Sequence, residues 1–269
     1  EILEGIVDGG TAVLNRDNRH FARLARWARE QQVSHVATFG QDAEAGVRLL
    51  DADCHADASD VHAAVHGQEV RFRIALPGRH WVINALGVLA MVHAADADVS
   101  QAAQSFATLT PAAGRGERRR IQLPDGPFEL IDDSYNANPT SMAAAFDVLG
   151  RARLSAQGRR IAALGDMLEL GVHSADMHAG LAQPIREAGI HQVFTCGPKM
   201  AALDAALPQQ LRGGHAADSA TLGALVADGV QAGDVVLVKG SAGAKMGKVV
   251  AALDALNQAG GSQEGGHAS

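Results

Sequence analysis

The sequence predicts an α/β protein in two segments, the second of which forms a mostly parallel, doubly wound sheet. Three observations lead to this prediction. A strand–helix–strand pattern opens the chain, a strand–helix rhythm repeats after residue 120, and residues 111–120 (PAAGRGERRR) between them show no hydrophobic period. The length of 269 residues allows one or two domains, and a hydrophobic fraction of 47% is enough for a buried core.

The first segment is predicted to begin with a βαβ unit. Residues 11–15 and 33–40 read as short buried strands, and residues 19–32 between them carry apolar side chains at helical spacing. Residues 47–53, 60–66 and 69–75 are then expected to form three strands, with Gly67-Gln68 as the hairpin turn between the last two. Two Ala-rich helices are expected to follow at residues 81–95 and 99–109.

The second segment is predicted to alternate strands and helices, which implies a parallel sheet with helices on both faces. The expected strands are residues 128–132, 160–165, 192–197 and 234–239. The expected helices are residues 142–149, 175–188, 199–207, 219–230 and 246–259. Ligands of such sheets bind at the carboxyl ends of the strands. Residues 258–269 are rich in Gly and Ser and are predicted to be a flexible tail.

Composition excludes several classes of protein. The formal net charge of −7 argues against nucleic acid as a partner, and no apolar run approaches the roughly 20 residues that a membrane span needs. Cys54 and Cys196 have neither metal nor redox spacing, so a reduced, cytoplasmic setting is expected. The histidines do not supply the three or four converging ligands of a metal site, so none is predicted. No signal peptide is visible, and because a natural protein rarely begins with Glu-Ile-Leu-Glu-Gly in place of Met, we expect a fragment.

The first functional candidate is IDDSYNANP, residues 131–139. A strand ends here in Asp132 and Asp133, and Asn138-Pro139 is suited to start a helix. The aspartates would therefore lie at the ligand edge of the sheet, where a carboxylate can hold the two hydroxyls of a ribose. A helix cap preceded by a solvated turn explains the same residues equally well.

Two further candidates also follow apolar strands. In LGDMLELG (residues 164–171), Asp166 and Glu169 could bind a cation or an ammonium group, although a plain polar loop has the same pattern. In VKGSAGAKM (residues 238–246), Lys239 and Ser241 precede a helix and could bind an anion, unless this is an ordinary turn. A Walker A phosphate loop, G-x-x-x-x-G-K-[ST], occurs nowhere in the chain.

The last candidates are basic or polar residues outside these strand ends. Arg115 lies between two glycines in GRGERRR (residues 114–120) and could swing onto a γ-phosphate, although a solvated linker is the simpler interpretation. His80 and Asn84 are four residues apart at a predicted helix start and would share one face, as capping groups or as ligand contacts.

Taken in order, these motifs resemble the Mur ligase superfamily. The series is LPGRH with a later NA, GR-x-E, DDSYNANP, LGDM-x-ELG and KGS-x-x-x-M, and it extends over nearly the whole chain. Within the superfamily it is most similar to the branch that adds D-Ala-D-Ala. Sister ligases typically carry a His-containing motif, such as DYAHNP, where this chain has DDSYNANP.

The resemblance implies a fold and an activity. Residues 1–109 would be the later half of the central ATPase domain, residues 110–257 a Rossmann-like C-terminal domain, and residues 258–269 a tail. With Mg²⁺, ATP would activate the carboxylate of UDP-MurNAc-tripeptide as an acyl phosphate, which the amine of D-Ala-D-Ala then attacks. The complete protein would be a cytoplasmic monomer without nucleic-acid partners.

The resemblance also implies roles for individual residues. His80 and Asn84 would face the base, Arg115 would reach the phosphates, and Asp132 or Asp133 would hold the ribose. Tyr135 and Asn136 would lie beside the nucleotide. The acceptor would be bound by Asn138, Asp166, Glu169, Lys239 and Ser241. Lys239 and Arg115 would be the catalytic cations, in keeping with phosphoryl transfer by charge neutralisation.

The sequence departs from the family pattern in two ways. Trp81 stands where the family usually has Asn after the His. The phosphate loop, the Mg²⁺ ligands and the carbamylated lysine lie outside these residues, so we expect that the chain alone does not hydrolyse ATP, as a phosphate-release assay would check. The remaining alternatives are a sister ligase with another acceptor, and a non-catalytic nucleotide- or peptide-binding module.

Overall fold

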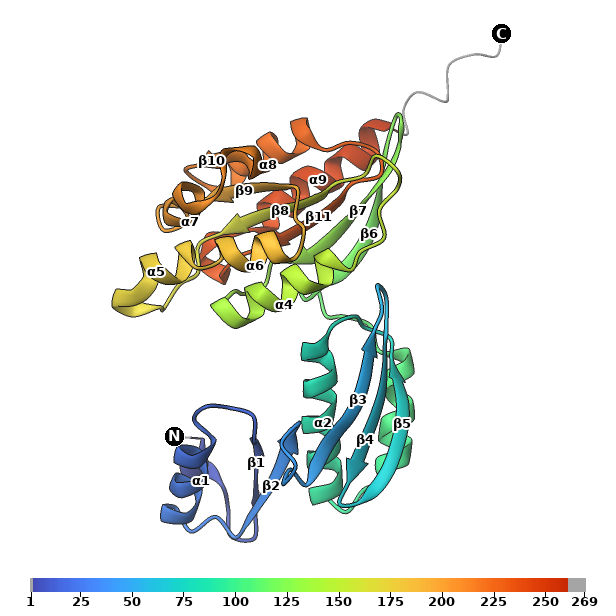
Figure 1. Cartoon of the computed structure of the whole chain (residues 1–269), viewed down its shortest axis with the longest axis vertical. Coiled ribbons are helices and arrows are strands. Elements are labelled where there is room, and N and C mark those ends of the chain that lie inside the picture. The colour runs from blue at the N-terminus through green and yellow to red at the C-terminus, as the bar shows by residue number, and fades with distance from the viewer. Residues whose placement is uncertain (1, 261–269) are drawn as a thin grey trace. The chain divides into compact units, whose positions relative to one another are not determined.

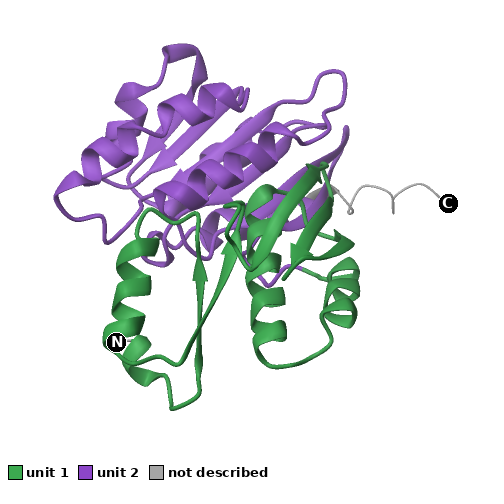
Figure 2. Ribbon diagram, turned by 60° about the horizontal axis from the view of Figure 1, so that its bottom comes forward, with its two compact units in different colours: residues 1–110 green, residues 111–269 purple. Residues whose placement is uncertain are grey.

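The computed structural model describes residues 2–260, which form two compact units (Figures 1 and 2). Unit 1 is Glu1–Thr110 and unit 2 is Pro111–Ser269, so the division falls one residue from the predicted one. Each unit has its own sheet and its own hydrophobic core. Within the described residues, no helix is long and apolar enough to cross a membrane.

Unit 1 contains a five-stranded mixed sheet. The strands lie in chain order: β1 (Thr11–Asn15), β2 (His35–Gly40), β3 (Val47–Cys54), β4 (Ser59–Val65) and β5 (Gln68–Ile74). The first three are parallel, as the predicted βαβ unit requires, and α1 (Phe21–Glu30) connects β1 to β2. β3, β4 and β5 are antiparallel, and every second residue of β4 is buried on the core face.

Helix α2 (Arg79–Ala94) covers one face of this sheet (Figure 1). Its residues Val82, Leu86 and Leu89 are fully buried against the strands. Helix α3 (Val99–Ser105) follows, and it begins where the Asp98 carboxylate accepts hydrogen bonds from two backbone N–H groups. A short 3₁₀ turn, Phe106–Thr108, completes the range predicted as one helix.

Unit 2 contains a six-stranded sheet with helices on both faces, which confirms the predicted fold class (Figure 1). Its strand order is β10-β9-β8-β11-β7-β6. The parallel strands are β7 (Gly126–Asp133), β8 (Arg160–Gly165), β9 (Gln192–Cys196), β10 (Arg212–Ala216) and β11 (Val235–Lys239). β6 (Glu117–Leu123) pairs antiparallel with β7 at the edge.

The helices of unit 2 divide into two layers. One core contains side chains of α4 (Pro139–Gly150), α6 (Ala182–Glu187) and α7 (Ala201–Ala206), and α5 (Ser174–Ala179) contacts α7. The other contains side chains of α8 (Ser219–Gly229) and α9 (Gly247–Gly260). Successive residues of β7 point to opposite faces, so Leu130 joins the second core and Ile131 the first.

Several predicted boundaries were wrong. The hairpin turn is His66-Gly67, one residue earlier than predicted, and both residues have the positive φ values (45° and 88°) of a two-residue hairpin turn. The predicted helix 175–188 is two helices, α5 and α6. α9 continues to Gly260, so residues 258–260 are helical and not tail, while residues 261–269 lie outside the described residues.

Two strands were not predicted. Residues 117–123 form β6, although residues 111–120 were interpreted as a linker without structure. Two of its three arginines are paired: Arg118 with Glu129, and Arg119 with Asp132 and Asp254. The run of arginines is therefore part of a strand in which two of the three charges are paired, not a flexible basic segment. The second missed strand is β10.

Candidate functional site

Three of the predicted motifs meet at the carboxyl edge of the sheet in unit 2. DDSYNANP follows β7, GDMLELG follows β8, and KGS follows β11. Because β11 lies between β8 and β7, the KGS loop is flanked by the other two (Figure 1). Parallel strands bring loops from distant parts of the chain to one edge, which is where such folds bind ligands.

Lys239 is the last residue of β11, and its ammonium group is held by the neighbouring loop. Nζ donates hydrogen bonds to Asp133 Oδ2 at 2.6 Å and to the carbonyl oxygen of Asn136 at 2.9 Å. Lys239 and Asp133 are register partners across β11 and β7, and Lys239 is only 3% exposed. The predicted catalytic lysine is thus a buried link between two loops.

Asp133 is the counter-ion of this lysine. Burial raises the pKa of the Asp133 carboxyl above its ordinary value, and this outweighs the opposing effect of the Lys239 ammonium. A carboxyl with a raised pKa binds its proton more tightly in the folded state than in the unfolded state. Its contribution to stability is therefore fully present at low pH and is lost as pH rises through the folded pKa.

An Asp133→Asn variant should reveal this linkage. The stability of the unmodified chain relative to the variant should fall as pH rises from about 4, the ordinary pKa of an aspartate, and level off once the carboxyl is ionised. Urea unfolding of both chains across this pH range measures the difference. A relative stability that rises over the same range would contradict the assignment.

Ser241 connects all three loops. Its backbone N–H donates to the carbonyl of Asp166 at 3.0 Å. Its hydroxyl accepts from the N–H of Leu168 at 2.9 Å and donates to the carbonyl of Ala137 at 3.3 Å. The side chain is 3% exposed, and its one hydroxyl hydrogen is used within the protein. The predicted acceptor-binding serine therefore braces the site in this structure.

Asp166 also has a structural partner. Its Oδ1 accepts from the backbone N–H groups of Lys199 (3.1 Å) and Met200 (2.8 Å), and so holds the loop that leads into α7. A Cβ on Gly197, whose φ is +98°, would come within 2.6 Å of this carboxylate, so only glycine fits there. Glu169, in contrast, is exposed and has a left-handed backbone (φ 61°), so its carboxylate projects from the loop into solvent.

The side chain of His178 anchors the GDMLELG loop through a hydrogen bond, a role that the sequence did not indicate. It is fully buried, its Nε2 accepts from the N–H of Met167 at 3.0 Å, and its Nδ1 donates to the carbonyl of Ser174 at 2.6 Å. Since the amide is necessarily the donor in the first bond, this is the neutral imidazole with its proton on Nδ1. The spacing of histidines along the chain gave no signal for this contact.

The side chains of Asp132 and Asp133 point to opposite faces of the sheet, because successive residues of a strand alternate between the two faces. Asp133 faces Lys239, whereas Asp132 accepts from Arg119 Nη2 at 3.0 Å and from the N–H of Ser134 at 3.1 Å. Arg119 in turn contacts Asp254 of α9 at 2.7 Å. Asp132 therefore belongs to an ion-pair network on the α9 side, and Asp133 is the one directed toward the KGS loop.

The rest of DDSYNANP turns outward. Asn138 is the cap of α4: its Oδ1 accepts from the N–H of Ser141, whose hydroxyl accepts from the N–H of Asn138. Asn136 is exposed, and its Oδ1 accepts from the N–H of Ala137. Tyr135 is 55% exposed, and the Arg115 guanidinium lies 4.2 Å from the centroid of its ring. The structure thus brings Arg115 to the edge where the three motifs meet.

His80 and Asn84 belong to unit 1. Both are exposed in the first turns of α2, as predicted, and helix position i, i+4 places them on one face. Trp81, the departure from the family pattern, is half-buried and packs against the core of unit 1.

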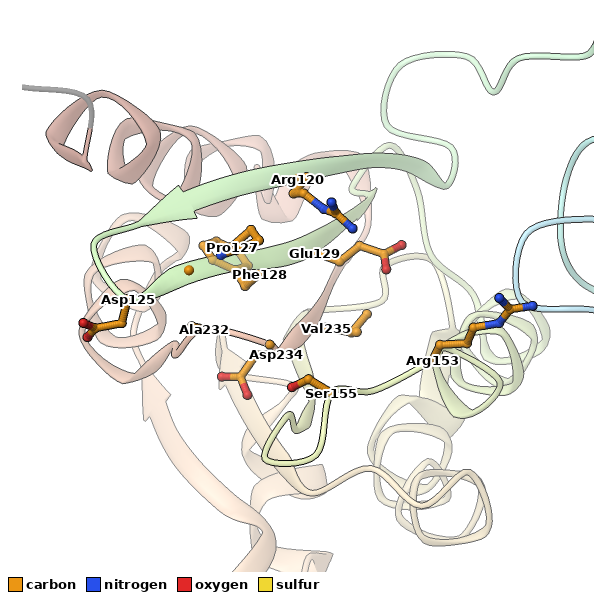
Figure 3. Close-up of a pocket in the computed structure, with 12 residues that line it drawn as sticks. Arg120, Asp125, Pro127, Phe128, Glu129, Arg153, Ser155, Ala232, Asp234 and Val235 are labelled. Atoms are coloured by element: carbon orange, nitrogen blue, oxygen red, sulfur yellow. The ribbon is translucent and has the colours of Figure 1, made fainter. Parts of the chain in front are cut away.

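The residues described, 2–260, contain no group of three or more His, Cys, Asp or Glu side chains that could hold a metal ion. A cavity of about 400 Å³ opens at the opposite, amino edge of the sheet of unit 2, and Figure 3 shows its lining side chains, among them Glu129, Arg153 and Asp234. It contains none of the predicted site residues, so it is separate from the edge where the motifs meet.

The fold and these motif positions define a class of protein: the chain belongs to the Mur ligase family. Residues 1–92 match the Mur ligase middle domain, and residues 114–242 match the family described as Mur ligase, glutamate ligase domain. The resemblance inferred from the motifs is confirmed.

Particular relatives are similar over most of the chain. The UDP-N-acetylmuramoyl-tripeptide–D-alanyl-D-alanine ligase of Escherichia coli (strain K12) is 32% identical over 94% of this chain and 54% of its own length. The UDP-N-acetylmuramate–L-alanine ligase of Streptomyces avermitilis is 31% identical over 55% of this chain and 31% of its own length. MurF of Acinetobacter baumannii has the same fold, with a TM-score of 0.79 and 23% identity over 94% of this chain and 53% of that chain. The chain therefore spans about half the length of these relatives, apart from the Streptomyces enzyme, of which it spans less.

Proposed function

We propose that this chain belongs to an ATP-dependent ligase that adds D-Ala-D-Ala to UDP-MurNAc-tripeptide in the cytoplasm. It would be the part of that enzyme that closes over the nucleotide and binds the acceptor. The observation that carries the proposal is the convergence of DDSYNANP, GDMLELG and KGS at one sheet edge. The similarity to the Escherichia coli D-Ala-D-Ala ligase extends through both units, which favours this acceptor.

The residues of this edge fit the phosphates of ATP better than a metal ion. Arg115 is exposed and carries a planar array of donors suited to phosphate oxygens. Lys239 is buried and its charge is paired with Asp133, so Arg115 is the one of the two predicted catalytic cations that is open to a phosphate. A triphosphate supplies the group that activates a carboxylate, and Mg²⁺ is expected to accompany it. Arg115 would orient the terminal phosphates, while Asp133 and Lys239 fix the loops beside them.

Glu169 is the group of this edge best placed to meet an incoming amine. Its carboxylate is exposed, whereas those of Asp166 and Asp132 accept backbone or arginine hydrogen bonds. Ser241 and Asn138 likewise make their hydrogen bonds within the protein. We therefore assign Glu169 to the acceptor ammonium and the other predicted acceptor residues to holding the loops in place.

A Glu169→Asn variant tests this assignment. Asn tolerates the left-handed backbone of this position, so the fold should be retained while the charge is lost. Losing one charge-assisted hydrogen bond should raise the KM for D-Ala-D-Ala about tenfold and leave the KM for ATP unchanged. Asp176→Asn, an exposed acid on α5, is the matched control. Equal KM values for D-Ala-D-Ala in the two variants would contradict the role of Glu169.

The overall function is tested with the longest open reading frame that encodes this chain. Phosphate release is measured with MgATP and UDP-MurNAc-tripeptide, and with D-Ala-D-Ala, D-Glu, meso-diaminopimelate or L-Lys as acceptor. Release that depends on D-Ala-D-Ala alone is the expected result. Release with another acceptor would identify a sister ligase. No release with any acceptor would favour a nucleotide- or peptide-binding module. Sedimentation of the same protein tests whether it is a monomer.

A further inference from the structure

The backbone on both sides of Arg115 is fixed. Gly116 N–H donates to the carbonyl of Asp132 at 2.8 Å, and Tyr135 N–H donates to the carbonyl of Gly114 at 3.0 Å. Gly114 is buried with φ +70°, and a Cβ there would lie 3.2 Å from the Tyr135 nitrogen. The two glycines therefore seat the loop firmly against DDSYNANP. Any movement of Arg115 is a rotation of its side chain and not a swing of the loop.

The side chain of Arg115 rests on an aromatic ring. Its guanidinium carbon is 4.2 Å from the centroid of Tyr135, whose ring is more than half exposed. Between residues 2 and 260 the structure gives Arg115 no ion pair, whereas Arg118 and Arg119 of the adjoining strand contact carboxylates. Arg115 is thus held by the ring contact, and the Asp133 carboxylate attracts it from beyond ion-pair distance.

We propose that Tyr135 is a positioning residue that stores the Arg115 guanidinium over its ring until the phosphates of a nucleotide draw it away. This inference rests on the proposed function for the nucleotide itself. A cation–π contact at an exposed site is weak, and a bidentate bond from arginine to phosphate is strong, so the phosphate displaces the ring. Before binding, the ring restricts the rotamers of a long side chain and keeps it near the sheet edge.

Tyr135 is the only tyrosine of the chain, which gives the stack a single spectroscopic probe. The 269-residue chain is labelled with 3-fluorotyrosine, and its ¹⁹F resonance is compared with that of Arg115→Gln. The two should differ without ligand, because only one ring carries a guanidinium. Inorganic tripolyphosphate should move the unmodified resonance toward the Arg115→Gln position and leave the variant unmoved. Sodium chloride at equal ionic strength is the control.

Two outcomes of this titration would overturn the proposal. Identical resonances without ligand would mean that the stack does not form. A resonance that tripolyphosphate leaves in place, or moves equally in the variant, would mean that phosphate does not release Arg115. Neither outcome depends on ligase activity, so a failure here is distinguishable from a failure of the proposed reaction.

The kinetic consequence is measured in the longer protein. Tyr135→Leu should lower the KM for ATP roughly three- to fivefold, because binding no longer has to break one exposed cation–π contact, and leave the KM for D-Ala-D-Ala unchanged. Tyr135→Phe keeps the ring and should restore the KM for ATP. Equal KM values for ATP in the Leu and Phe variants would show that the ring does not position Arg115.

Discussion

Replacing Lys239 by Met should lower the free energy of unfolding of unit 2 by about 3 kcal/mol. The methionine fills a similar volume but leaves Asp133 largely buried without its cation and the carbonyl of Asn136 without its donor. Urea unfolding of the chain measures the loss. Lys248→Met, which removes an exposed lysine from α9, should stay within about 0.5 kcal/mol of the unmodified chain.

The same substitution should reduce ligase turnover by about 10²-fold in the longer protein, because the loops that Lys239 joins would shift relative to each other. A double variant, Lys239→Met with Asp133→Asn, separates the causes. It should recover part of the stability, since no uncompensated carboxylate remains, but not the turnover. A Lys239→Met variant as stable as the Lys248→Met control would show that the buried pair contributes nothing to the fold.

Asp234→Ala, at the amino edge of the sheet, should cost about 3–5 kcal/mol of stability. The Asp234 side chain is fully buried. It accepts from three nitrogens of Arg159, at 2.9, 3.1 and 2.6 Å, and from the N–H of Gln231 at 2.8 Å. Removing the carboxylate leaves the Arg159 guanidinium without its anionic partner and the backbone N–H groups of Arg159 and Gln231 without their acceptor.

Thermal unfolding of the Asp234→Ala chain gives the measurement, with the exposed Asp228→Ala as the matched control. Because Asp234 lies at the edge opposite the motifs, the KM values of the fraction that still folds should be unchanged. A change in KM for ATP without a loss of stability would mean that the two edges of the sheet are coupled, contrary to this expectation.

Local patterns predicted the central strands well because these strands are continuous apolar runs. β8 and β11 are buried on both faces, and their composition indicates that directly. β10 (RGGHA) escaped prediction because two glycines weaken the strand signal at the sheet edge. β6 escaped because three consecutive arginines suggest solvent, whereas two of them pair with carboxylates from 11 to 135 residues away along the chain.

The place of the site was predictable, and its internal contacts were not. Strand ends of a parallel sheet converge, so motifs after β7, β8 and β11 had to meet. Whether Asp132 or Asp133 faces the site depends on the register with β11 and on Arg119. Asp166 is engaged by amides 33 and 34 residues away along the chain, and Ser241 by loops 73 and 104 residues away. No local pattern contains such partners.

The position of β11 has a consequence for how the polypeptide is made. This strand comes last in the chain but lies in the middle of the sheet, between β8 and β7. A nascent chain that ends before Val235 has β6 with β7, and β8 with β9 and β10, but no strand that joins the two groups. The sheet can close only when nearly all of unit 2 has left the ribosome. Until then two apolar strand edges stay open, so synthesis of this unit exposes the chain to mispairing longer than a sheet built in chain order would.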